Sequence, residues 1–227
     1  MEQQGLSAIS QTRLGDIAYQ EIANAIISGV FRPGDKLTIR GIADMLEISS
    51  TPVRDAINRL LLEGALEQRG PRDIRVPLIT CDSYREIADI RGELEGLAAA
   101  RAAERRSDAD LEALRLNIEE NEQAIRNKDW QNAIRLNKQF HFALAEMARM
   151  PVLIGLLNGL WLQIGPPISS FYNRGGRNMI DHHHAVLEAI RLQHPDEARR
   201  HIAHDIASSV ENIIAHISAS TGDGDTT

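Results

Sequence analysis

The sequence lacks several features that would restrict its class at once. It contains a single cysteine, Cys81, in 227 residues, which excludes an intramolecular disulfide and fits a reducing, cytoplasmic setting. Its first ten residues lack the basic and apolar segments of a secretory signal. No apolar run approaches the roughly 20 residues that span a bilayer. We therefore expect no membrane partner.

Excess positive charge and catalytic motifs are also missing. The net charge of −7 argues against coating nucleic acid through bulk charge, so any DNA contact must come from locally placed arginines. We find no nucleophile–base pair, no glycine-rich phosphate loop and no HExxH sequence. With 43% hydrophobic and 25% charged residues, the composition is that of an ordinary globular protein. The length allows one large or two modest domains.

What the sequence does contain is a predicted helix with both ends marked. Thr51 is suited to cap it, Pro52 to occupy its first position, and Gly64 to end it in the left-handed conformation. Its apolar residues share one stripe, whereas Arg54 stays exposed near its start. Insertion into the DNA major groove and an ordinary amphipathic surface helix both fit this segment. The stripe consists of Val53, Ala56, Ile57, Leu60 and Leu61.

The neighbouring segments favour the DNA-binding interpretation. A short helix over Ile39–Leu46 leads through a tight connection into the helix over Thr51–Gly64, which is the plan of a helix-turn-helix. Downstream, Ala65–Gln68 and Ile74–Pro77 are expected to pair as a hairpin with a basic tip. This hairpin is either a wing whose arginines touch phosphate or the minor groove, or a solvated loop.

Four blocks of this region, in fixed order and spacing, resemble the GntR family of bacterial transcription regulators. The resemblance covers about 65 residues and implies a winged helix that binds a pseudo-palindromic operator as a homodimer. Ser50 stands where the family often has arginine. The family's DNA-contacting positions fall on Arg40, Ser50, Thr51, Arg54, Arg69 and Gly70. The blocks are Ser28–Leu37, Ile42–Leu46, Thr51–Ala56 and Leu60–Gly64.

The rest of the chain is predicted to be an all-α bundle, because helical periodicity recurs and strand-like alternation does not appear. Gly165-Pro166-Pro167 is expected to break its most apolar helix. The last two helices are expected over Met179–Leu192 and Asp196–Ile217. The predicted fold class is therefore mainly α: a winged helix-turn-helix domain with a small β-hairpin over residues 1–79, then an all-α effector, metal-binding and dimerisation domain over residues 80–220.

Potential metal ligands recur on successive helices of this bundle. Asn137 and His141 share one helix face, His182 to His184 open a later helix, and His201 and Asp205 lie one turn apart on the last. Imidazole with oxygen ligands suits a divalent ion such as Zn, Ni, Mn or Fe(II). The alternative is that these histidines are solvated, or satisfied within the core.

This half also resembles the FCD ligand-binding domain of the FadR branch of the same family, over nearly all of residues 82–217. The resemblance implies a metal site in which Asn137 stands where the family has aspartate. His204 or His201 are alternatives to Asp205. The implied ligands are Asn137, His141, His183 and Asp205. The matching anchors are Arg91–Glu95, Asn137–His141, Asp181–Ile190 and Ala198–Ile206.

The resemblance also implies that a small organic acid binds beside the metal, near His141 and His183. Arg91 is suited to grip its carboxylate, because a guanidinium fork matches one; the alternative is a surface ion pair between Arg91 and Glu95. We interpret the chain as an effector-controlled transcription regulator, a repressor, and not an enzyme. A metal-dependent enzyme built on the His141/His183 cluster and a helical interaction module with structural histidines are the alternatives.

Overall fold

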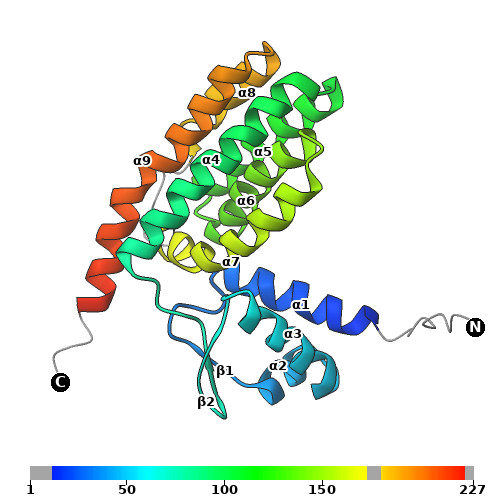
Figure 1. Ribbon diagram of the computed structural model, residues 1–227, viewed down its shortest axis with the longest axis vertical. Coiled ribbons are helices and arrows are strands. Elements are labelled where there is room, and N and C mark those ends of the chain that lie inside the picture. Colours follow the sequence, from blue (N-terminus) through cyan, green and yellow to red (C-terminus); the bar gives the residue numbers. More distant parts are fainter. Residues whose placement is uncertain (1–11, 173–179, 223–227) are drawn as a thin grey trace, which may run out of the picture.

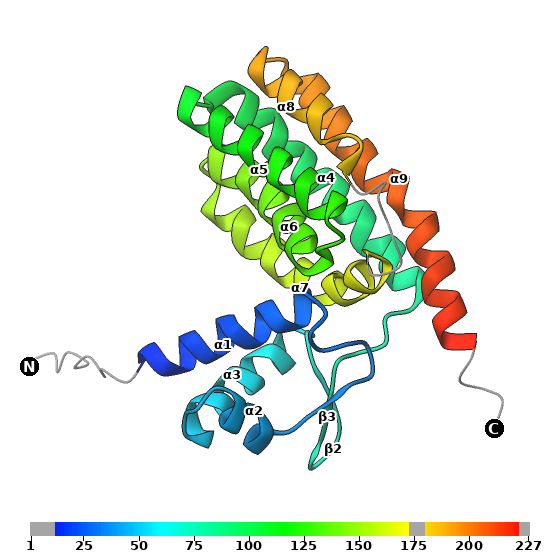
Figure 2. The same cartoon turned by 180° about the vertical axis from the view of Figure 1, so that it is seen from behind.

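The computed structural model describes residues 12–172 and 180–222 and is predominantly helical (Figure 1). A small N-terminal group of elements lies against one end of a larger helical bundle in both views (Figures 1 and 2). The predicted fold class is confirmed. The N-terminal elements are α1 (Thr12–Ile27), β1 (Lys36–Leu37), α2 (Ile39–Met45), α3 (Ser50–Leu62), β2 (Glu67–Gly70) and β3 (Asp73–Arg75). The bundle contains α4 (Cys81–Arg105), α5 (Asp108–Arg126), α6 (Trp130–Met147), α7 (Pro151–Tyr172), α8 (His183–Arg191) and α9 (Pro195–Gly222).

Helices α2 and α3 form the helix-turn-helix, and α3 packs against both α1 and α2. The helix α3 begins earlier than predicted: Ser49 is its N-cap residue, so the capping role given to Thr51 was wrong. Pro52 then lies in the first turn, where its missing N–H costs no hydrogen bond. The other end was predicted correctly, because Gly64 has a φ of 71°. The buried stripe of α3 is Val53, Ala56, Ile57 and Leu60.

The predicted hairpin is part of a three-stranded antiparallel sheet with the order β1-β3-β2. The two hairpin strands are shifted from the prediction, because Gln68 pairs with Ile74 and Gly70 pairs with Asp73. Arg69 and Gly70 therefore lie within β2 and not in the loop, which Pro71 and Arg72 form. The two-residue strand β1 was not predicted.

Side-chain caps set the starts of three bundle helices. Thr80 accepts from the backbone N–H of Ser83 at the start of α4, and Asp129 accepts from that of Asn132 at the start of α6. Ser107 begins α5 with a capping box. In both views the long helices α4 and α9 run side by side (Figures 1 and 2). The helix expected from Met179 begins at His183 in the structure, and Met179 itself lies outside the described residues.

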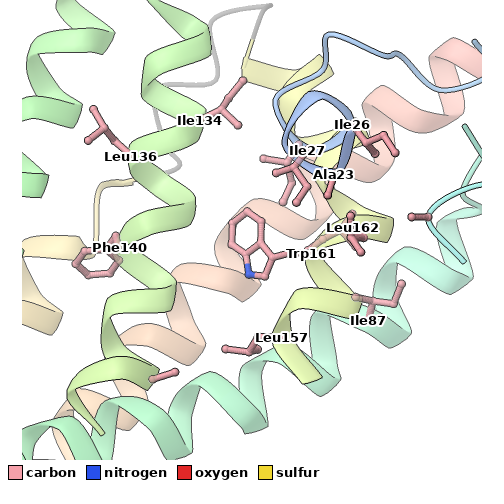
Figure 3. Close-up of a cluster of buried hydrophobic side chains, with 14 of the residues drawn as sticks. Ala23, Ile26, Ile27, Ile87, Ile134, Leu136, Phe140, Leu157, Trp161 and Leu162 are labelled. Carbon is pink, nitrogen blue, oxygen red and sulfur yellow. The ribbon is translucent and has the colours of Figure 1, made fainter. Parts of the chain in front are cut away.

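Helix α7 runs without interruption through Pro166 and Pro167, so the predicted break at Gly165 was wrong. Each proline removes one helical hydrogen bond, but tertiary packing compensates because both rings are buried. Figure 3 shows Trp161 and Leu162 of α7 facing the C-terminal end of α1. The most apolar helix of the bundle therefore packs against the N-terminal group of elements.

By length and composition alone, α7 also meets the criterion for a membrane span, with 22 residues and a mean hydropathy of 1.3. The expectation that no run approaches such a length was therefore wrong for this segment. However, 56% of the apolar segment that meets this criterion is buried within the protein. Helix α7 also contacts α1, α4, α6 and α9. These contacts give α7 the environment of a core helix.

Candidate functional site

The predicted DNA-contacting residues lie on the exposed side of the helix-turn-helix and the hairpin. Ser50 and Thr51 are exposed in the first turn of α3, Arg54 is exposed one turn after Ser50, and Arg40 is exposed at the start of α2. The first turn of a helix also presents unpaired backbone N–H groups, which favour a phosphate. This surface therefore combines donors and positive charge at the helix end that would enter a groove.

The arginines of this surface differ in their availability. Within the described residues, Arg40 and Arg54 make no side-chain hydrogen bond or ion pair. Arg69 is engaged with Glu67, with 2.6 Å between its Nη2 and Oε1. The residue-by-residue resemblance did not select Arg72, which lies at the exposed tip of the hairpin. The signal was present in the sequence, since Arg72 follows Pro71 in the predicted turn.

A second group of predicted residues meets inside the bundle. His141 of α6, His183 at the start of α8 and Asp205 of α9 are all buried, and their potential ligand atoms lie within 4.8 Å of one another. The Nε2 atoms of His141 and His183 lie 3.6 and 3.8 Å from Asp205 Oδ2. Asn137 is buried one turn before His141 on the same face of α6.

These residues fit a metal site on two observations. Within the described part of the chain, both ring nitrogens of His183, Oδ1 of Asn137 and Oδ1 of Asp205 are buried without a hydrogen-bond partner. Leaving such groups unpaired costs about 1–3 kcal/mol each, which a bound ion would offset. The separations of 3.6 and 3.8 Å are close to the value of about 3.4 Å for two ligand atoms about 2.1 Å from one tetrahedral zinc.

The electrostatics of the group also suit a cation. Burial lowers the pKa of His183 well below its usual value, and the neighbouring histidines lower it further. Burial lowers the pKa of His141 as well, against the opposing effect of the Glu95 carboxylate. Both imidazoles are thus held in the neutral form that binds metals. Burial and the Glu95 charge raise the pKa of the Asp205 carboxyl well above its usual value, and they outweigh the opposing effect of the Arg91 charge.

The alternatives to Asp205 lie elsewhere. His204 is exposed, and its ring centroid lies 4.4 Å from that of His182. His201 is partly exposed one turn before Asp205 on α9. Among the described residues, the group that could share one ion contains Asp205 and neither of these histidines.

Arg91 pairs with Glu95, but the pair is buried and is not the surface ion pair that one of the two sequence interpretations expected. Arg91 is 4% exposed and donates from Nε to Oε1 of the fully buried Glu95 over 2.6 Å. Its guanidinium also lies over the Trp161 ring, 4.4 Å from the centroid. Burial disfavours the charge on Glu95, but Arg91 and His141 outweigh this effect and lower its pKa from 4.5 to about 2. Contact between Arg91 and an effector stays a prediction.

A winged helix-turn-helix joined to a helical domain with a buried polar cluster is the architecture of a DNA-binding transcription regulator. The chain belongs to the GntR family of such regulators. Residues 14–76 match the bacterial regulatory proteins of the gntR family, and residues 86–208 match the FCD domain. These families and the named relatives are transcription regulators, so the enzyme alternative is set aside.

Similar proteins cover most of the chain. The transcriptional regulator McbR of Escherichia coli is 29% identical over 187 residues, which are 81% of this chain and 85% of McbR. The Uxu operon regulator of Haemophilus influenzae is 30% identical over 213 residues, covering 83% of this chain and 76% of that protein. The transcriptional repressor NanR of an Enterobacter strain is 25% identical, with coverage of 85% and 82%.

Solved structures agree with this assignment. The structure of E. coli McbR/YncC has a TM-score of 0.84 and 27% identity, and covers 91% of this chain and 99% of its own. A GntR regulator from Rhodococcus has a TM-score of 0.75 at 20% identity, with coverage of 90% and 99%, and shares the fold.

Proposed function

We propose that this protein is a cytoplasmic, homodimeric repressor that binds a pseudo-palindromic operator and is controlled by a small organic acid. In this proposal a divalent ion sits among Asn137, His141, His183 and Asp205. One observation carries the metal assignment: two imidazoles and a carboxyl group converge in the core, and several of their polar atoms have no hydrogen-bond partner among the described residues. A nitrogen–oxygen ligand set of this kind suits Zn, Ni, Mn or Fe(II).

The effector is proposed to bind this ion beside His141 and His183. Four protein ligands leave room on an ion that accepts five or six, and carboxylate oxygens are good ligands for hard or borderline ions. The bound ion would supply a Lewis-acidic positive charge that attracts the effector's carboxylate. The protein would supply the shape of the site and exclude water from it.

Helix α7 offers a route from this site to the DNA-binding half. Its Trp161 ring lies 5.3 Å from the His141 ring, and two turns later Ser169 Oγ donates to the backbone oxygen of Ser28 over 2.9 Å. An effector that shifts α7 would therefore act on α1, which packs against α3. Because half-sites lie about one turn of DNA apart, small changes in the spacing of two recognition helices alter operator affinity.

Two measurements on the full, untagged chain test this function. Selection from random duplexes should recover an inverted repeat, and Arg54→Ala should weaken binding to it. Elemental analysis should find close to one divalent ion per chain in the wild-type protein and much less in His141→Ala. Recovery of no preferred sequence would contradict the regulator mechanism. A metal content below about a tenth of an equivalent, unaltered by His141→Ala, would contradict the metal site.

A further inference from the structure

A fully buried carboxylate, Glu95, contacts the candidate metal site although it belongs to none of the predicted ligand positions. Its Oε2 lies 2.5 Å from Nδ1 of His141, and its Oε1 accepts from Nε of Arg91 over 2.6 Å. All three side chains are buried. The chain Arg91–Glu95–His141 therefore runs from α4 to the ligand on α6.

This geometry determines which nitrogen of His141 carries the proton. The Glu95 carboxylate is already paired with the Arg91 guanidinium, and a carboxylate in such a pair only accepts hydrogen bonds, so Nδ1 of His141 must be the donor and Nε2 must hold the lone pair. Nε2 is the atom that lies 3.6 Å from Asp205 Oδ2, on the side of the proposed ion. The ring is thus held with its ligating atom facing the site before any ion arrives.

His183 provides an internal contrast. Within the described residues neither of its ring nitrogens has a hydrogen-bond partner. Its ring is instead stacked on Phe140, with centroids 3.7 Å apart and planes 9° apart. The stacking fixes the plane of the ring but does not select a tautomer. The protein therefore orients its two histidines by different means.

We infer that Glu95 and Arg91 are positioning residues: Glu95 selects the ligating tautomer of His141, and Arg91 acts through Glu95. The metal part of this inference rests on the proposed function. It gives Arg91 a role other than gripping the effector, because its Nε is already engaged with Glu95 and its face with Trp161. Losing a carboxylate of this kind typically weakens metal binding about 10–100-fold.

The first test measures the tautomer in the metal-free wild-type chain by long-range ¹H–¹⁵N correlation spectra. We expect the proton of His141 on Nδ1. In Glu95→Gln, whose amide can also donate, we expect a mixture of tautomers. A wild-type proton on Nε2 overturns the inference. The wild-type spectrum needs neither a variant nor a metal. It therefore remains decisive if Glu95→Gln fails to fold or if the chain binds no ion.

The second test measures Zn²⁺ affinity by competition with a chromophoric chelator. We expect Glu95→Gln and Arg91→Met each to bind Zn²⁺ about 10–100-fold more weakly. The double variant should be little weaker than Glu95→Gln alone, because the residues act in series. The matched controls on α4 are Glu93→Gln and Arg101→Met, whose ion pairs are exposed and which should keep wild-type affinity. Unchanged Zn²⁺ affinity in Glu95→Gln would overturn the positioning role of Glu95. Additive losses in the double variant would overturn the inference that Arg91 acts through Glu95.

These measurements also separate the two roles of Arg91. If Arg91 contacts only the effector, the Arg91→Met variant keeps wild-type Zn²⁺ affinity, and the inference that Arg91 acts through Glu95 is wrong. If wild-type protein binds no Zn²⁺ and yet carries the His141 proton on Nδ1, the proposed metal function fails while the tautomer assignment stands.

Discussion

A Cβ atom placed on Gly165 of α7 would lie 2.8 Å from the Cα of Ile27 in α1, so the two helices meet at their backbones. Gly165 is one turn after Trp161, whose ring lies against that of the proposed ligand His141, and one turn before Ser169, which donates to the backbone oxygen of Ser28. These three residues of α7 recur at intervals of four and so share one side of the helix. The bundle and the DNA-binding half are therefore joined by a close-packed contact as well as by the segment of chain between β3 and α4.

We predict that Gly165→Ala destabilises the protein, because the backbone of Ile27 cannot yield as a side chain can. The expected cost is about 1–3 kcal/mol in the free energy of unfolding, measured by urea denaturation. Operator affinity should change while Zn²⁺ affinity stays near wild type. The control is Gly155→Ala in the same helix, where a Cβ meets nothing within 4 Å. That variant should be stabilised by up to about 1 kcal/mol; equal effects of the two would refute the close contact.

A second prediction concerns Gly29, which has a φ of 75° and lies where a Cβ would be 1.9 Å from Ser169 Oγ. Gly29→Ala should lower the free energy of unfolding by more than the roughly 1–2 kcal/mol that a left-handed alanine costs alone. Gly64→Ala is the matched control, because Gly64 has a φ of 71° and its nearest foreign atom is 3.8 Å away. Chemical denaturation of both variants separates backbone strain from the clash. A loss no larger at Gly29 than at Gly64 would show that the two halves separate freely there.

The local signals in the sequence predicted the helix-turn-helix well. The stripe of α3 and the terminating Gly64 depend on spacing within one segment, and both are seen. Tertiary context decided the features that were missed. The sequence predicted a break at Pro166 and Pro167 because each proline removes a hydrogen bond within its own helix. The packing that maintains α7 comes from other helices, which the local sequence does not show. The strand β1 has two residues, too few to show alternation.

Helical spacing indicated potential metal ligands on successive helices, but only the family resemblance selected one set from them, because the three grouped residues lie on helices distant in sequence. No local pattern favoured Asp205 over His201 or His204; the phase of α9 decides which of them faces inward. Glu95 was missed because an Arg91–Glu95 spacing of four is the usual sign of an exposed ion pair. Only the packing of α4 against α6 and α9 buries that pair and brings it to His141.

A third prediction concerns the exposed arginines of the DNA-binding half. Arg54→Ala should cost about 1–3 kcal/mol in operator binding if Arg54 reads a base edge, and the loss should be confined to the specific sequence. Arg72→Ala, at the hairpin tip, should instead weaken binding to all duplexes and reduce the salt slope by about 1. Fluorescence anisotropy titrations over a range of salt concentrations measure both. Arg115→Ala, on the exposed face of α5, should leave operator affinity unchanged; wild-type affinity in Arg54→Ala would remove Arg54 from the interface.

A fourth prediction concerns the metal ligands. His183→Ala should bind Zn²⁺ far more weakly than wild type and lose the thermal stabilisation that added Zn²⁺ gives. That stabilisation is RT ln(1 + [L]/Kd), or about 2.7 kcal/mol at 100 times Kd. His204→Ala is the control, because His204 is exposed next to the proposed ligand Asp205 and contacts His182. Differential scanning calorimetry with Zn²⁺ or a chelator measures both. If His204→Ala loses the Zn²⁺ response and His183→Ala keeps it, the assigned ligand set is wrong.

The last prediction is that operator and effector oppose each other reciprocally. The proposed effector is a small carboxylate on the ion beside His141 and His183, and α7 connects that site to α1. If an acid weakens operator binding by some factor, the operator must weaken binding of that acid by the same factor, typically about 1–3 kcal/mol of coupling. Calorimetric titrations of organic acids measure the affinity of the acid for the protein with and without operator duplex. Ser169→Ala, which removes the bond to Ser28, should reduce the coupling but keep the acid's affinity for the free protein. An acid that binds in the bundle with equal affinity in both titrations would show that the site does not control the DNA-binding half.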